Sequence, residues 1–203
     1  NQVYAFYIVC SQFAAFGIHL SLAKHLAEHE QDVSLRRVVL SSGFLLSFVV
    51  ALFFSSLLWL SRGAVGYFFS PRVGFGVGIV SLGVFFFSLN KSLLYSLNGM
   101  RFFKEYALFQ SLRFFFMLGT LVALIVLGVD GVYTPGIFPV AEGLLFLCLV
   151  VFCRRDFCFA ASAFPSLIEW GRRHLFFGLK SSGGHILLLV NTRIDVLFLG
   201  FFT

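Results

Sequence analysis

Long apolar runs separated by short polar segments organise this chain. Predominantly apolar stretches of helical length cover residues 3–22, 38–60, 73–97, 106–129, 137–152 and 175–203. About 20 apolar residues in a helix cross the hydrocarbon core of a bilayer. The runs are continuous and do not alternate with a period of two, which disfavours an outer-membrane barrel. The pattern therefore predicts an all-α, polytopic bundle with six transmembrane helices.

The polar segments predict where these helices end. The segment 23–39 mixes charges of both signs and is expected to form a short helix and a turn in water. Gly99 is expected to break the chain before an interfacial segment, 98–113. We expect three units: an N-terminal transmembrane part (1–152), a cytoplasmic linker (153–174) and a further helix (175–203).

The composition excludes an ordinary soluble domain. Hydrophobic residues make up 59% of the chain and charged residues only 12%, whereas soluble domains carry about 25% charged residues. The four cysteines lie in or beside apolar runs and form no C-x-x-C motif, so we expect inert thiols and neither a metal nor a cofactor. No basic, aromatic-rich patch suggests binding to nucleic acid.

The basic residues predict the orientation in the membrane. Segments after the first, third and fifth runs hold ten of them: Lys24, Arg36, Arg37, Arg101, Lys104, Arg113, Arg154, Arg155, Arg172 and Arg173. Segments after the second and fourth runs hold only Arg62 and Arg72. Because Lys and Arg concentrate in cytoplasmic loops, the first set is expected in the cytoplasm.

Several charged and amide side chains interrupt the apolar runs. They are Asn90, Lys91, Lys180, Asn191, Arg193 and Asp195. A charge within a transmembrane helix is costly, so it usually faces a protein interior or a watery cavity and has a function there. In the last run, Lys180, Asn191 and Asp195 share one helical stripe, while Arg193 points nearly the opposite way from Asp195.

These side chains have alternative interpretations. Asp195 either neutralises a neighbouring basic group or couples an ion, whereas Arg193 and Lys91 suit phosphate binding. Lys180 either binds an anion or extends to the headgroups. His19 and His185 are expected to be hydrogen-bonded polar residues rather than proton carriers. Glu142 is expected near the outer interface, solvated or at a helix end.

The chain shows no catalytic arrangement of side chains. It contains no Ser/His/Asp or Cys/His pattern, no phosphate-binding Gly-rich loop after a strand and no H-E-x-x-H motif. Its expected outer loops are short, which disfavours a membrane enzyme acting on lipid-linked sugars. We therefore expect a protein that is not an enzyme.

Nearly the whole chain carries a resemblance to a known family, including the opening with AKHLAEHE at 23–30, which resembles that family's second helix and following loop. The G-L-K at 178–180 followed by NTRIDVLFLGFF at 191–202 resembles a charged stretch of bacterial oligosaccharide flippases, the polysaccharide-biosynthesis exporters of the multidrug/oligosaccharidyl-lipid/polysaccharide superfamily. LNKSLLYSLNGMRFFKEYALFQSLR, residues 89–113, is similar to the fourth helix and following turn of that family. Thr192 and the Ser182-Gly183-Gly184 sequence depart from the family pattern. By this resemblance the chain is an internal fragment holding helices two to seven of twelve or more, arranged in two pseudo-symmetric lobes.

The resemblance implies a function in the bacterial inner membrane. A polyprenyl-diphosphate-linked oligosaccharide would cross to the periplasmic leaflet by alternating access. Arg193, Lys91 and Lys180 would bind the diphosphate, Asn191 and Asn90 would add hydrogen bonds, and Asp195 would hold a basic partner or an ion. Membrane lipids and other polysaccharide-assembly proteins are the expected partners.

Three other functions fit the sequence less well. A drug or cation exporter of the same superfamily should have an acidic cavity, whereas three cations and one carboxylate lie within these runs: Lys91, Lys180, Arg193 and Asp195. A membrane-embedded glycan polymerase or ligase should have a long outer loop. A purely structural membrane subunit is the remaining alternative.

Overall fold

The computed structural model describes residues 2–158 and 164–191 of the chain, with side chains described up to Gly183. Every regular element in these ranges is a helix, so the all-α prediction is confirmed for them. The elements are α1 (Gln2–Ala15), α2 (Ile18–Glu28), α3 (Val33–Phe68), α4 (Pro71–Gly99), α5 (Phe103–Val126), the short 3₁₀ helix η1 (Gly131–Gly136), α6 (Ile137–Cys153) and α7 (Phe164–Asn191).

Several of these helices have the length and composition of membrane spans. Within the described ranges there are four, α3, α4, α5 and the continuous η1–α6 segment, and a fifth if α1 and α2 form one bent span. These helices give the chain the character of a multi-pass membrane protein. The expected sixth span, 175–203, extends past the described residues, so the count of six stays a prediction.

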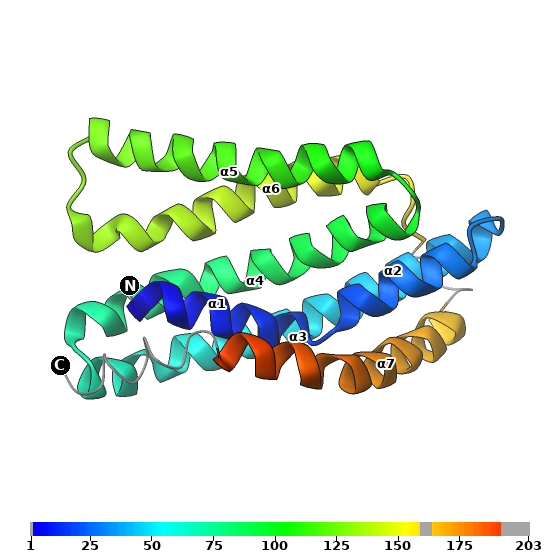
Figure 1. The fold of residues 1–203 in the computed structure, drawn as a ribbon, viewed down its shortest axis with the longest axis horizontal. Coiled ribbons are helices and arrows are strands. Elements are labelled where there is room, and N and C mark those ends of the chain that lie inside the picture. Colours follow the sequence, from blue (N-terminus) through cyan, green and yellow to red (C-terminus); the bar gives the residue numbers. More distant parts are fainter. Residues whose placement is uncertain (1, 159–163, 192–203) are drawn as a thin grey trace.

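Helix α4 is the centre of the bundle. It packs against α1, α2, α3, α5 and α6, and its buried side chains extend from Val77 to Leu97. Figure 1 shows the α5–α6 hairpin on one side of α4, with α1, α2, α3 and α7 on the other side. Helix α5 lies at the edge, and Phe109 is its only buried residue. Polar side chains on α4 are therefore enclosed by protein from several directions.

Local chemistry sets the two ends of α4. The Ser70 hydroxyl accepts a hydrogen bond from the Val73 amide at 3.3 Å, and Pro71 occupies the first helical position, where its missing N–H costs nothing. At the other end, a Cβ atom on Gly99 would lie 2.6 Å from the Ala23 carbonyl oxygen, so only glycine permits this approach of α4 to α2. The expected break at Gly99 is confirmed.

The first apolar run is broken, whereas a continuous helix over 3–22 was expected. Phe16 and Gly17 have φ values of 45° and 68°, and α1 and α2 meet at an angle of 44°. Gly17 meets Gly178 of α7: a Cβ on Gly17 would lie 2.8 Å from the Gly178 carbonyl oxygen. The freed backbone groups are still used, since the Gly17 carbonyl accepts from the Leu20 and Ser21 amides at 3.1 and 3.3 Å. The break is thus a built feature stabilised by α7.

Helix α3 is longer than the apolar pattern indicated. It starts at Val33, inside the segment expected to be a turn in water, and continues to Phe68. Arg62 therefore lies within the helix and not in a loop, and its guanidinium stacks 4.1 Å from the Trp59 ring centre. The helix continues past the apolar run because no strong breaker occurs before the Ser70–Pro71 pair.

Helix α7 begins inside the segment expected to be a cytoplasmic linker. It starts at Phe164, and His174 is fully buried. The His174 ring lies 2.8 Å from the Ser21 hydroxyl through Nδ1 and 3.2 Å from the Val39 carbonyl oxygen through Nε2. This histidine joins α7 to α2 and α3, so the segment 164–174 belongs to the packed bundle.

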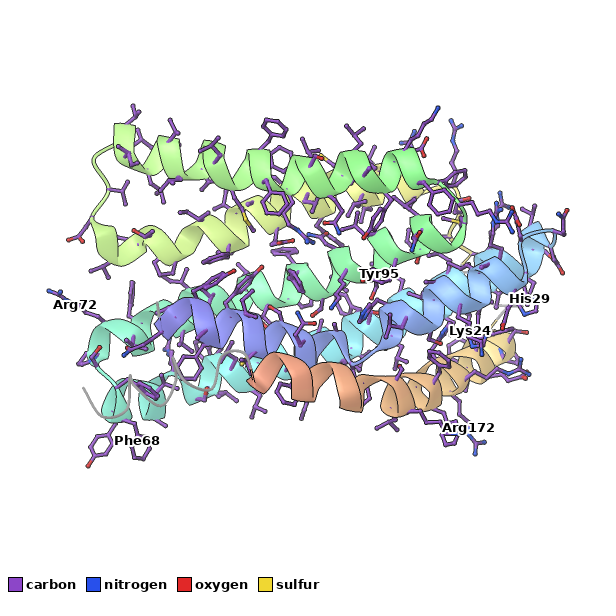
Figure 2. The ribbon with its side chains drawn as sticks, viewed as in Figure 1. Lys24, His29, Phe68, Arg72, Tyr95 and Arg172 are labelled. Carbon is purple, nitrogen blue, oxygen red and sulfur yellow. The ribbon has the colours of Figure 1, made fainter. Side chains whose placement is uncertain are left out.

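One end of the bundle collects most of the basic residues. Figure 2 places Lys24, His29 and Arg172 at this end and Phe68 and Arg72 at the opposite end. By the order of the helices, the first end, called here the basic end, holds nine of the ten residues predicted to be cytoplasmic, all except Arg113. Arg113 lies in the middle of α5, so its assignment to a loop was wrong.

The start of α3 at the basic end yields a testable prediction. The Asp32 carboxylate accepts hydrogen bonds from the Leu35 and Ser34 amides, both at 3.0 Å, and from the Ser34 hydroxyl at 2.7 Å. These bonds, the Leu35 amide first and the Ser34 hydroxyl second, hold the pKa of Asp32 below its usual range. A lowered pKa in the fold means that the stabilisation is present above the pKa of the unfolded chain and is lost as the pH falls through the folded value. Asp32→Ala is expected to lower the thermal midpoint near neutral pH, with a smaller difference in acid, whereas Asp32→Asn keeps the cap. Equal midpoints for Asp32→Ala and the original chain at neutral pH would contradict this assignment.

Candidate functional site

A cluster of polar side chains lies among four helices in the bundle interior. Its members, called here the central polar cluster, are Tyr7 and Gln12 of α1, Asn90 and Lys91 of α4, Arg113 of α5 and Glu142 of α6. Ionisable groups at such depth in a membrane bundle are expensive, so they indicate a function or a specific structural pairing.

Glu142 is a fully enclosed member of the central polar cluster. Its exposed fraction is 0%. Asn90 Nδ2 donates to Oε2 at 2.7 Å and to the Glu142 main-chain carbonyl at 2.8 Å, and the Tyr7 hydroxyl donates to Oε1 at 3.3 Å. Glu142 was expected near the outer interface, solvated or at a helix end, and that prediction was wrong. Its position close to the start of α6 suggested solvent, but α1, α4 and α5 cover it.

Arg113 supplies the counter-charge to Glu142. Its Nε lies 3.0 Å from Glu142 Oε1, and only 12% of the arginine side chain is exposed. The Nε–H is not aimed at the carboxylate, however, so the pair is held by charge and not by a well-aligned hydrogen bond. Nη1 donates to Gln110 Oε1 at 3.3 Å, while Nη2 is buried without a hydrogen-bond partner. The guanidinium therefore keeps unused donor capacity.

Lys91 is a buried cation that makes no ion pair within the described part of the chain. It is 9% exposed. Its Nζ donates to Gln12 Oε1 at 2.6 Å and lies 5.8 Å from the Phe87 ring centre. The Arg113 guanidinium lies 5.0 Å from the same ring. Both cations therefore lie beside the Phe87 ring. The Lys91 ammonium has three N–H donors, and Gln12 accepts from one of them.

The central polar cluster carries more positive than negative charge. Lys91 and Arg113 are its cations, and Glu142 is its only carboxylate. A buried charge without a counter-charge is strongly unfavourable. Among the described residues the cluster therefore has one negative charge fewer than positive charges, which suits it to an anion.

The cluster lies beside the broken helix. Gln12, the partner of Lys91, is one turn before the break at Phe16 and Gly17. Irregular backbone at membrane depth is tolerated where protein or a cavity covers it. In transporters, discontinuous helices mark substrate and ion sites. The bend between α1 and α2 lies next to Lys91, which makes no ion pair among the described residues, so this place is a candidate ligand site.

The structure brings together only some of the predicted site residues. Lys91 and Asn90 both lie in the bundle interior, but Asn90 contacts Glu142 and Lys91 contacts Gln12. Lys180 is exposed on α7, where its Nζ lies 4.4 Å from the Phe176 ring centre, away from this cluster. The remaining predicted residues fall outside the description: Arg193 and Asp195 entirely, and Asn191 and His185 in their side chains.

Sequence reasoning missed four members of the site: Tyr7, Gln12, Arg113 and Glu142. A signal for the arginine was present: Arg113 and Glu142 are isolated opposite charges inside two consecutive apolar helices. Consecutive helices joined by a short connection pack antiparallel. The two opposite charges could therefore have been expected to pair across the hairpin. Tyr7 gave no comparable signal, because one tyrosine among so many aromatics is ordinary.

No known family model, no curated protein and no solved structure matches the chain. The bundle, the broken helix and the charges of the central polar cluster are therefore the features that point to a function.

Proposed function

We propose that this chain belongs to a membrane transporter that moves a polyprenyl-diphosphate-linked oligosaccharide across the bacterial inner membrane. The observation that carries the proposal is the surplus of buried positive charge in the central polar cluster, beside a broken helix. A cation exporter would need an acidic surplus at this depth. An anion would balance the surplus positive charge found among the described residues of the cluster.

The donor groups suit a diphosphate. Arg113 Nη2 is unused, and Lys91 has donors beyond the one given to Gln12. Guanidinium groups bind phosphate oxygens through paired N–H groups, and an ammonium binds them as a compact point charge. Lys91 and Arg113 would hold the two phosphates, while the lipid chain stays in the membrane.

Transport would proceed by alternating access. The basic end would face the cytoplasm, in keeping with the positive-inside rule. Lys91 and Glu142 are enclosed in this conformation, so a substrate would reach them only after the surrounding helices separate. The break between α1 and α2 is a suitable place for such a movement. Arg193, Asn191, Asp195 and Lys180 would contribute from the segment that the resemblance assigns to a second lobe.

Replacing Lys91 tests the proposed function. The gene that encodes this chain would be expressed in a bacterial strain lacking its own oligosaccharide flippase, and surface polysaccharide would be measured at equal membrane levels. Lys91→Gln is expected to lower surface polysaccharide about 10-fold or more, because one lost charge-assisted contact is worth roughly 1.5–3 kcal/mol. Lys91→Arg is expected to retain partial activity.

Two further variants complete this experiment. Lys104→Gln removes an exposed cation at the start of α5 and should leave activity unchanged. Lys180→Gln asks whether the exposed lysine on α7 contributes as the sequence predicted. Full activity of Lys91→Gln would exclude Lys91 as a substrate contact and remove the main support for anion transport.

A further inference from the structure

The contact between Arg113 and Glu142 depends on the charge of the carboxylate. Nε approaches Oε1 to 3.0 Å without an aligned hydrogen bond, and Nη2 contacts no acceptor. Glu142 receives its aligned hydrogen bonds from Asn90 and Tyr7 instead. If Glu142 were protonated, its hydrogen bonds to these two neighbours could persist, whereas its attraction for the guanidinium would largely disappear.

We propose that Glu142 is a proton switch for anion binding: when its carboxylate takes up a proton, Arg113 is released to join Lys91 in binding the diphosphate. Each substrate bound would then be accompanied by one proton, transferred from water to a carboxylate oxygen of Glu142. This inference rests on the proposed function. It adds Arg113 as a binding residue and makes substrate affinity depend on pH.

The charge balance of the buried cluster favours this coupling. A diphosphate that joins a lipid to a sugar carries one ionised oxygen on each phosphate. With Glu142 ionised, Lys91 and Arg113 face three negative groups, which leaves one negative charge uncompensated. With Glu142 protonated, the two cations and the two phosphates cancel. Because uncompensated buried charge is costly, binding of the anion and binding of the proton must favour each other, and the effect is reciprocal.

The groups that face Glu142 can accommodate either protonation state. They are Tyr7 from α1, Asn90 from α4 and Arg113 from α5; Lys91 contacts Gln12 and the Phe87 ring instead. A protonated carboxyl needs an acceptor. The Tyr7 hydroxyl contacts Oε1 and can accept as well as donate. The added proton therefore has an acceptor beside the carboxyl group.

Proton counting during binding tests the switch directly. The full chain, purified in dodecyl maltoside, would be titrated calorimetrically with farnesyl-diphosphate-linked N-acetylglucosamine, a diphosphate diester that does not itself titrate near neutral pH. Titrations in two buffers with different ionisation enthalpies give the number of protons taken up. Where Glu142 is ionised in the ligand-free chain, we expect the uptake of nearly one proton per bound ligand. In that pH range the affinity for the diester should fall by up to about 10-fold for each unit of rising pH.

Two variants sharpen this measurement. Glu142→Gln should bind the diester with no proton uptake and with an affinity independent of pH. Glu105→Gln, which removes a carboxylate near the start of α5, should behave like the original chain. If Glu142→Gln does not fold, the number of protons taken up by the original chain still tests whether binding is coupled to protonation.

The possible outcomes separate the two proposals. Binding by the original chain without proton uptake, or undiminished uptake in Glu142→Gln, would overturn the switch and leave the proposed function standing. Failure of the original chain to bind the diester at any pH would overturn the proposed function, and the switch with it.

Discussion

Replacing Arg113 by leucine is expected to destabilise the bundle by about 3–5 kcal/mol, the usual cost of breaking a buried ion pair from one side. Glu142 is fully buried and has Arg113 as its counter-charge, with Nε 3.0 Å from Oε1. Without the guanidinium, the carboxylate is left with the Asn90 and Tyr7 hydrogen bonds and no opposite charge. Removing Arg113 alone should therefore lower the free energy of unfolding more than removing Arg113 and Glu142 together.

Unfolding in mixed micelles of dodecyl maltoside and dodecyl sulfate would measure this effect. The double variant Arg113→Leu/Glu142→Leu removes both charges and is expected to recover most of the lost free energy. Arg101→Leu is the matched control, because Arg101 pairs with Glu30 at 3.1 Å on the surface, and exposed pairs contribute about 1 kcal/mol or less. A double variant less stable than Arg113→Leu would show that the charges themselves stabilise the bundle.

Replacing Gly178 by alanine is expected to destabilise the contact of α7 with the broken helix by about 1–3 kcal/mol, as for other overpacked sites. A Cβ on Gly178 would lie 2.5 Å from the Phe16 carbonyl oxygen. That oxygen belongs to the backbone and cannot move aside as a flexible side chain would. The helices must separate, and the geometry of the break changes with them.

Gly183 of the same helix provides the control for Gly178. A Cβ on Gly183 would meet nothing within 4 Å, so Gly183→Ala should be neutral or stabilising by up to about 1 kcal/mol through helix propensity. Both variants can be compared by thermal unfolding in detergent. If Gly178→Ala were as stable as Gly183→Ala, the close approach between Gly178 and Phe16 would not be a determinant of the bundle.

The sequence predicted those features that depend on local pattern. The helices over 73–97, 106–129 and 137–152 correspond closely to α4, α5 and α6, because the length of an apolar run is a local property. The helix end at Gly99 was also local. The enclosure of Lys91 and Asn90 followed from the cost of polar groups inside apolar helices.

The features that were missed depend on contacts between distant segments. No proline near Phe16–Gly17 indicates a break in the sequence. The break is stabilised by the close contact with Gly178, which lies far along the chain. Glu142 lies close to the start of its helix, so its burial could be known only from the helices that cover it. Lys180 faces outward because of the way α7 packs, which the helical stripe alone could not decide.

The pairing of Arg113 with Glu142 also bears on how the chain enters a membrane during synthesis. These residues belong to α5 and α6, which follow one another and are separated only by the short segment containing η1. A charged residue entering alone at the centre of a bilayer costs about 2.5–3.5 kcal/mol on insertion scales. Inserted together as a hairpin, the two helices cancel their charges before the rest of the bundle assembles. We therefore expect α5 and α6 to enter the membrane together, with the charges of Arg113 and Glu142 balanced before later helices pack against them.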